Sequence, residues 1–138
     1  MKAKMIFIEG VDRTGKGSLM QAIHKETQYK HVIFDRGVIS NIVYATVNGR
    51  LTTDLMRQYQ SLEKQIAKSN HVVIYLTCST EVLKERMENT NHEYVDFDLH
   101  KKVFEEVCSS SPLNIKVVDT SNKTPEQIAK LLKEAEII

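Results

Sequence analysis

A glycine-rich segment near the start of the chain has the spacing of a phosphate-binding loop. The pattern Gly-x4-Gly-Lys spans Gly10, Gly15 and Lys16, between an apolar run and a helix-like segment. Glycines allow backbone angles that turn successive N–H groups into one cavity, and the positive end of the following helix adds to its field. Lys16 would reach the outer phosphates of a nucleotide, while a nearby hydroxyl group would help to hold Mg²⁺. The common (Walker A) motif has Ser or Thr directly after the lysine, whereas here Gly17 comes first and Ser18 follows.

A second pair of chemically capable residues, Asp35 and Arg36, comes directly after another apolar run. A carboxylate at such a position can hold a water molecule of the Mg²⁺ shell or orient an attacking oxygen. A guanidinium group can bind a phosphate through two parallel hydrogen bonds. The alternative is a structural Asp–Arg pair that caps the end of a strand.

Four short apolar runs predict the strands that would position these residues. They are nearly continuous, as is typical of strands covered on both faces, and they span Lys4–Ile8, His31–Asp35, His71–Leu76 and Ile115–Asp119. The segments between them have helical periodicity. The alternation predicts an α/β fold with a mostly parallel sheet of about four strands. Ligands of such sheets bind beyond the carboxyl ends of the strands, where both candidate segments lie.

Helices are predicted from apolar spacing and from helix-start signals. The predicted segments are Gly17–Gln28, Thr80–Met87, a stretch marked by Leu99, Val103 and Val107, and one that starts at Thr124-Pro125 with Gln127 three residues after the cap. Leu55, Tyr59, Leu62 and Ile66 share one face of a further helix. Core packing is the favoured interpretation of this stripe, and a face that pairs with a second copy is the alternative.

Composition sets limits on function. The chain has 138 residues, which corresponds to one domain, and 41% hydrophobic with 27% charged residues indicates a soluble globular protein. The net charge of +1 gives no overall field that would recruit nucleic acid or an anionic membrane. The apolar runs are too short to span a bilayer, and the first ends at Glu9 before a signal peptide could form. Cys78 and Cys108 show no paired motif and indicate a reducing compartment, so we expect a cytoplasmic protein without membrane or nucleic-acid partners.

The same two segments resemble a known family. Glu9-Gly10-Val11-Asp12-Arg13-x-Gly-Lys resembles the phosphate loop of thymidylate kinases, and Gly-Lys-Gly-Ser is similar to the form in adenylate-kinase-like enzymes. The string Asp35-Arg36-x3-Ser40-x3-Tyr44 resembles the thymidylate kinase signature Asp-Arg-Tyr-x2-Ser-x2-Ala-Tyr-Gln. The resemblance implies a three-layer P-loop NTPase fold over residues 1–138. It also implies transfer of the γ-phosphoryl group of ATP, with Mg²⁺, to a (deoxy)nucleoside monophosphate.

The resemblance assigns roles to individual residues. The catalytic set is Arg13, Lys16, Asp35 and Arg36. The nucleotide-binding set is Gly10, Asp12, Thr14, Gly15, Lys16, Gly17, Ser18 and Arg86. The acceptor-binding set is Asp12, Arg36, Ser40 and Tyr44, and Mg²⁺ would be held by Ser18 and Asp35. Thymidylate kinases pair through helices, so a homodimer is a further expectation.

The donor side of the resemblance continues after the third strand. Arg86 matches an arginine that stacks on the adenine of ATP, with a surface arginine as the alternative. The polar segment Glu88–Asp98 fits either a lid over the phosphates or an ordinary solvated loop. No Lys or Arg lies between Arg86 and Lys101, so Arg13 is the candidate catalytic arginine. The segment Thr120-Ser121-Asn122 resembles the turn that lies near the donor base.

The acceptor side departs from the family pattern. Thymidylate kinases have a further strand and helices between the phosphate-loop helix and the Asp-Arg strand, whereas here Gln28 almost directly precedes His31. The absent part carries an acceptor-phosphate segment and a base-stacking aromatic. Ala45 follows Tyr44 in place of glutamine, and Gly37 replaces the aromatic after Asp-Arg. Substitutes for the missing phosphate contacts would be Arg50 and Arg57, although each is more typical of a solvated arginine.

These departures leave other functions open. One is a nucleotide-binding module with little or no kinase activity. Another is a kinase for a different acceptor, such as a nucleoside, which would need a base near its 5′-hydroxyl, and Glu9 and Asp35 are the candidates. The five histidines show no metal-ligand spacing.

Overall fold

The described part of the chain folds around one parallel β-sheet. The computed structural model describes residues 2–11, 15–79, 81–82, 84–85 and 96–138. Within them, the strands are β1 (Met5–Glu9), β2 (Val32–Asp35), β3 (His71–Thr77) and β4 (Ile115–Asp119), in the spatial order β2-β1-β3-β4. Every pair of neighbouring strands is parallel. The four predicted strands are therefore confirmed, with ends that differ by one residue at most.

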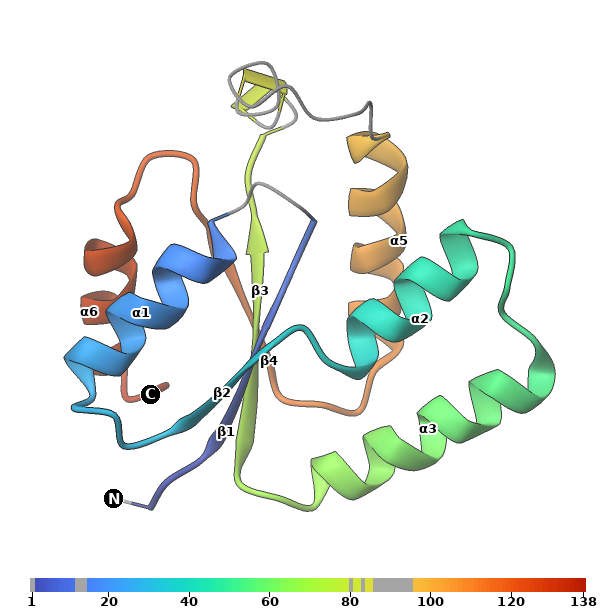
Figure 1. The fold of residues 1–138 in the computed structure, drawn as a ribbon, viewed down its shortest axis with the longest axis horizontal. Coiled ribbons are helices and arrows are strands. Elements are labelled where there is room, and N and C mark those ends of the chain that lie inside the picture. The colour runs from blue at the N-terminus through green and yellow to red at the C-terminus, as the bar shows by residue number, and fades with distance from the viewer. Residues whose placement is uncertain (1, 12–14, 80, 83, 86–95) are drawn as a thin grey trace.

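Helices that lie within the described residues cover the two faces of the sheet. They are α1 (Lys16–Glu26), α2 (Val38–Val47), α3 (Thr53–Ala67), α5 (Phe97–Ser110) and α6 (Pro125–Glu134). Figure 1 shows α1 and α6 together on one face, and α2 and α5 on the other, with α3 beside α2. This three-layer α/β arrangement is the predicted fold class.

Alternate side chains of the central strands form two separate cores. Ile6 and Ile8 of β1 pack on one face with Leu19, Ile23 and Ile128 of α1 and α6. The other face has its own core, which contains Phe7, Ile39, Val43, Val73 and Phe104. Because both faces of β1 and β3 are covered, their sequences read as continuous apolar runs.

Helix ends follow local sequence signals. Thr124 accepts a hydrogen bond from the Gln127 N–H at 3.1 Å, and the Gln127 side chain accepts one from the Thr124 N–H at 2.8 Å. This capping box confirms the predicted start of α6. The helix predicted over Gly17–Gln28 ends earlier, at Glu26, because Gln28 and Tyr29 adopt left-handed backbone angles (φ 54° and 58°). In the predicted segment Thr80–Met87, the described residues Glu81, Val82, Lys84 and Glu85 are helical.

Helix α2 was not predicted. Its sequence, VISNIVYATV, is rich in β-branched residues, which lower helix propensity. Six of its ten residues are nevertheless buried, most of them in the core that also contains residues of β1, β3 and α5. Tertiary burial therefore outweighs the weak intrinsic preference of this segment for a helix.

None of the helices in the described residues combines the length and apolar character that crossing a bilayer requires.

Candidate active site

The phosphate loop begins where β1 ends, at the centre of the sheet. Gly10 and Gly15 both have positive φ, 141° and 92°, and Gly15 is the residue that precedes α1. Lys16 is buried, and its Nζ donates hydrogen bonds to the carbonyl oxygens of Gly10 (3.2 Å) and Val11 (2.9 Å). The lysine ammonium therefore lies over the start of the loop. Asp12, Arg13 and Thr14 lie outside the described residues, so their predicted roles stay predictions.

Gly17 and Ser18, the two residues that follow Lys16, lie where the loop meets the helix. Gly17 and Ser18 are both exposed in the first turn of α1. A Cβ built on Gly17 meets no heavy atom within 4 Å. The packing of the described residues therefore does not require glycine after Lys16. Ser18, a predicted magnesium ligand, is thus exposed at this helix end.

The acceptor candidates lie beside the loop, at the carboxyl end of β2. Ile8 and Asp35 are register partners in the sheet, and the Arg36 N–H donates to the Ile8 carbonyl oxygen at 2.9 Å. Asp35 is exposed. Arg36 has a left-handed backbone (φ 68°), which is uncommon for a residue with a Cβ and is found preferentially at functional sites. The structure thus brings Asp35 and Arg36 next to the end of β1.

Arg36 and Tyr44 are in direct contact. The guanidinium carbon of Arg36 lies 5.1 Å from the ring centroid of Tyr44, within the range of a cation–π interaction. Two rings from α5 meet Tyr44 edge-on, with centroid distances of 5.7 Å for His100 and 6.0 Å for Phe104. Phe104 in turn stacks on Tyr75 of β3 at 5.7 Å. Tyr44 therefore belongs to an aromatic cluster that supports Arg36, and sequence reasoning missed the participation of His100 because a single histidine has no spacing signal.

Glu9, the last residue of β1, connects the two segments. It is fully buried (0% exposed), and its Oε1 accepts from the Gly37 N–H at 2.8 Å and from the Ser40 hydroxyl at 2.7 Å. Its Oε2 accepts from the Ser40 N–H at 2.6 Å. Burial raises the pKa of the Glu9 carboxyl above its ordinary value, although these hydrogen bonds and the Arg36 charge act in the opposite direction. Ser40, a predicted acceptor-binding residue, is buried and directs its hydroxyl toward Glu9.

Gly37 is explained by packing. A Cβ at this position would lie 2.7 Å from Cδ1 of Phe7, closer than real Cβ contacts come. The Phe7 ring is itself stacked on Phe34, with ring centroids 4.9 Å apart. An aromatic residue after Asp35-Arg36, as in the family signature, would not fit this arrangement.

The loops after β3 and β4 lie side by side on the predicted donor-base side. The Ser79 N–H donates to the Ser121 hydroxyl at 3.2 Å, and the Thr120 N–H donates to the Thr77 carbonyl oxygen at 2.8 Å. Hydrogen bonds from Ser121 hold the pKa of Asp119 below its usual range. The segment Thr120-Ser121-Asn122 is thus linked to the loop that leads toward Arg86. Arg86 itself lies outside the described residues.

The predicted C-terminal boundary of the lid segment, Asp98, is wrong. Of Glu88–Asp98, residues 88–95 lie outside the described part of the chain. Phe97 and Asp98, however, are the first residues of α5, and Asp96 caps this helix by accepting from the Leu99 N–H at 3.0 Å. Phe97 is buried in the core. An apolar anchor and a capping aspartate therefore start helix α5 before the predicted lid ends.

Arg57 has the environment of an ordinary surface arginine, and the two cysteines form no disulfide. Arg57 is exposed and lies 3.7 Å from Asp54 of the same helix. Both cysteines are free thiols, and Cys78 is buried. Among the described residues, no group of three or more His, Cys, Asp or Glu side chains could hold a metal ion.

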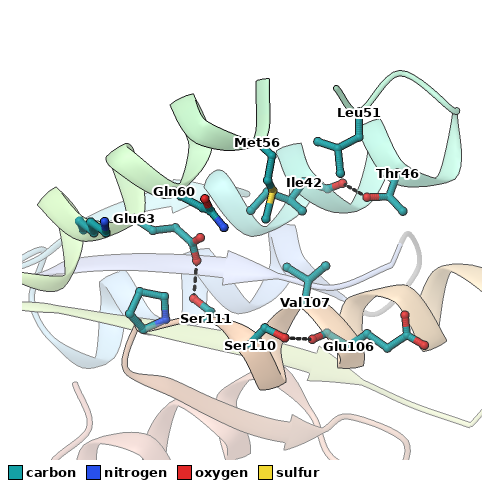
Figure 2. Close-up of a pocket in the computed structure, with 12 residues that line it drawn as sticks. Ile42, Thr46, Leu51, Met56, Gln60, Glu63, Glu106, Val107, Ser110 and Ser111 are labelled. Carbon is teal, nitrogen blue, oxygen red and sulfur yellow. Dashed lines mark hydrogen bonds between the residues drawn. The ribbon is translucent and has the colours of Figure 1, made fainter. Parts of the chain in front are cut away.

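A cavity of about 490 Å³ lies between α2, α3 and α5. Figure 2 shows Ile42, Met56 and Val107 on its walls, with a hydrogen bond of 2.5 Å from the Ser111 hydroxyl to the Glu63 carboxylate at one end. Its lining includes none of the predicted site residues. This cavity is therefore separate from the site at the ends of β1 and β2.

Comparison with known proteins adds the family. The thymidylate kinase family model matches residues 23–131. The chain belongs to the thymidylate kinase family. The match begins within α1, after the phosphate loop, so the family membership and the loop motif are independent observations. Together with the fold, they support a nucleotide kinase-like activity.

Two curated relatives extend this comparison. The chain is 31% identical over 121 residues to the SPbeta prophage-derived uncharacterized protein YorR of Bacillus subtilis. The aligned region covers 86% of the chain and 73% of YorR. The chain is also 28% identical over 116 residues to a probable thymidylate kinase of Methanococcus vannielii. This aligned region covers 77% of the chain but only 56% of the archaeal protein. This member of the thymidylate kinase family therefore matches little more than half the length of the archaeal relative.

Solved structures have the same fold. The crystal structure of YorR, in complex with phosphorylated GDP, superposes with a TM-score of 0.78 at 24% identity and covers 97% of this chain and 96% of YorR. A sugar kinase from Janibacter sp. HTCC2649, solved without ligand, gives a TM-score of 0.55 at 16% identity, with 98% and 95% coverage. At these identities, the likeness concerns the fold alone.

Proposed function

We propose that this chain is a single-domain nucleotide kinase that transfers the γ-phosphoryl group of ATP to a (deoxy)nucleoside monophosphate. The observation that carries the proposal is the pairing of β1 with β2. It brings the end of the phosphate loop strand and the Asp35-Arg36 segment to the same edge of the sheet. Phosphoryl transfer needs a donor and an acceptor held in line, and two adjacent strand ends are suited to hold them.

The proposed roles follow from charge and position. Lys16 binds the outer phosphates of ATP, and Arg13 offsets the charge that develops on the transferring group. Arg36 binds the acceptor phosphate, and its contact with Tyr44 supports that orientation. Asp35 orients the acceptor oxygen through its exposed carboxylate.

The residues present fit a magnesium ion. Mg²⁺ in kinases is usually bound by one or two protein oxygens together with phosphates and waters. The Ser18 hydroxyl and the Asp35 carboxylate are oxygen ligands, and both residues are exposed at the candidate site. When bound, Mg²⁺ would neutralise phosphate charge during transfer.

Two observations bear on the base of the acceptor. YorR was crystallised with phosphorylated GDP, so guanine nucleotides belong in any acceptor panel beside thymidine monophosphate. Tyr44 is followed by Ala45 rather than by the glutamine of the family signature. This substitution favours an acceptor other than thymidylate.

Two alternatives remain, each with a supporting observation. A binding module with little kinase activity is supported by β2, a four-residue strand at the edge of the sheet, where the family pattern has additional structure. A nucleoside kinase would need a base, and Asp35 is the better candidate for it. Glu9 is fully buried, and both of its oxygens accept hydrogen bonds from the protein.

One experiment separates these functions. ATP consumption with Mg²⁺ would be measured against a panel of nucleoside monophosphates, including guanine and thymine forms, and against the matching nucleosides. Turnover that depends on a monophosphate supports the proposal, and turnover with nucleosides alone supports the nucleoside kinase. Saturable ATP binding without acceptor-dependent turnover would overturn both kinase functions and support the binding module.

A further inference from the structure

The buried carboxylate of Glu9 is bound by three donors from a segment about thirty residues later in the chain. The Gly37 N–H, the Ser40 N–H and the Ser40 hydroxyl all donate to it, at 2.6 to 2.8 Å. These donors occupy both carboxylate oxygens. Hydrogen bonds to a charged group of this length are among the stronger ones in proteins.

Two of these donors are N–H groups at the start of α2. Gly37 precedes the helix and has no side chain to cap it, and α2 has no acidic residue in its first turn. The N-terminal N–H groups of a helix need acceptors, and they favour a negative charge. Glu9 supplies both the acceptor and the charge from a neighbouring strand.

Arg36 lies between the two points at which β1 holds this segment. Its own N–H donates to the Ile8 carbonyl oxygen, and the next N–H, that of Gly37, donates to Glu9. Two consecutive residues of β1 therefore fix two consecutive residues of the segment. This attachment fixes the peptide groups on both sides of Arg36, whose backbone is left-handed (φ 68°).

We propose that Glu9 is a positioning residue of the acceptor site, and that it directs the Arg36 guanidinium by fixing the backbone on which Arg36 stands. Glu9 makes no contact with substrate, since it is fully buried. The attachment starts at the last residue of β1, directly before Gly10. The inference rests on the proposed function, in which Arg36 binds the acceptor phosphate.

The chemistry of the site requires a carboxylate. Three donors point at Glu9, and a carboxylate can accept all of them. A glutamine at position 9 would place an NH₂ group against one of these donors. We therefore expect Glu9→Gln to keep the fold while losing one of the hydrogen bonds that hold Gly37 and Ser40.

The test is a kinetic comparison of Glu9→Gln with a matched control, Glu63→Gln. Glu63 is also a buried glutamate (5% exposed) that accepts from a serine, Ser111, but it lies in the separate cavity of Figure 2. We expect Glu9→Gln to raise the KM for the acceptor about tenfold or more, with the KM for ATP unchanged. Glu63→Gln should leave both constants unchanged. An unchanged acceptor KM in Glu9→Gln would overturn the proposal.

A double-mutant cycle shows whether Glu9 acts through Arg36. In an Arg36→Ala background, Glu9→Gln should produce no further change in the acceptor KM. If the two effects instead multiply, Glu9 acts independently of Arg36 and the proposal fails. Ser40→Ala removes one donor and keeps the Ser40 N–H, so it should give a smaller effect in the same direction. It also serves as the test variant if Glu9→Gln does not fold.

A spectroscopic measurement separates failure of this inference from failure of the proposed function. If no acceptor is turned over, the proposed function has failed, and the ¹H–¹⁵N spectrum of the apoprotein decides the inference. Glu9→Gln should shift the backbone and Nε–H resonances of Arg36, while those of Ser121 stay in place. Unchanged Arg36 resonances would overturn the positioning role.

Discussion

The phosphate-loop side and the acceptor side of this sheet are held in very different ways. Strand β1 pairs on both of its edges, and four of its five residues are buried. Strand β2 has four residues, pairs on one edge in the described residues, and has three exposed residues. The loop proposed to bind the donor thus starts from the interior of the protein, whereas the segment proposed to bind the acceptor starts from its margin.

This difference shows where such a fold tolerates a shortened sequence. Removing structure next to an edge strand leaves the two central cores intact, because neither core depends on a partner beyond β2. The acceptor segment then needs another means of fixation. Hydrogen bonds from Arg36 and Gly37 to β1 provide it, together with the stack of Phe7 on Phe34.

The largest effect is expected on the phosphate-loop side. Lys16→Ala should lower acceptor-dependent ATP turnover by at least about 100-fold, because it removes a charge that stabilises the transferring phosphates. The measurement is initial rate at saturating ATP. Circular dichroism and a thermal melt would control for the loss of the hydrogen bonds from Lys16 to Gly10 and Val11. A folded variant with wild-type turnover would contradict the role of Lys16.

On the acceptor side, the side chain of Arg36 should contribute to binding of the acceptor but not to binding of ATP. Arg36→Ala should raise the KM for the acceptor about 10- to 100-fold through loss of a charge-assisted phosphate contact, with the KM for ATP unchanged. Arg57→Ala is the control, because Arg57 is exposed and contacts Asp54 of its own helix. Equal effects of both substitutions, or an effect of Arg36→Ala on ATP alone, would contradict the division into two sides.

The packing that fixes the acceptor segment can be tested by stability. Gly37→Ala should lower the free energy of unfolding by about 1–3 kcal/mol, because the new Cβ would lie 2.7 Å from the Phe7 ring. Gly17→Ala is the matched control on the phosphate-loop side, where a Cβ meets nothing within 4 Å and alanine favours the helix. Urea unfolding measures both. Similar values for the two variants would mean that the Phe7 ring moves freely aside.

The same contrast explains what the sequence could predict. Strands β1 and β3 and the phosphate loop were predictable because central parallel strands and glycine spacing leave strong local signals. Helix α2 was not, since its β-branched residues favour a strand and only burial makes it a helix. The attachment of Glu9 to Gly37 and Ser40 joins residues 28 and 31 positions apart, and no periodicity reveals such a contact. The role of Asp96 as the cap of α5 was hidden within an acidic segment that resembled a lid.

A third region, the outer helix α3, tests the expectation of a homodimer. Leu62, from the predicted stripe, is 46% exposed, and Glu63 is the only buried residue of α3. If this face pairs with a second copy, Leu62→Glu should shift the protein from dimer to monomer in light scattering, with an unchanged circular dichroism spectrum. An oligomeric state that is identical in wild type and variant would count against this face.

The smallest effect expected concerns the pH dependence of stability that Glu9 produces. The raised pKa of the folded Glu9 carboxyl means that, above the ordinary glutamate pKa, the folded protein retains a proton that the unfolded chain has lost. The free energy of unfolding should therefore fall as the pH rises from the ordinary value through the raised one. Glu9→Gln lacks this titration, so its stability relative to the wild type should increase over the same interval.

Asp119, whose pKa is lowered, is present in both proteins, and its contribution cancels in the difference. Urea unfolding of both proteins at several pH values between 4 and 8 measures this difference. A difference that is constant with pH would mean that the hydrogen bonds from Gly37 and Ser40 offset the cost of burying the Glu9 charge.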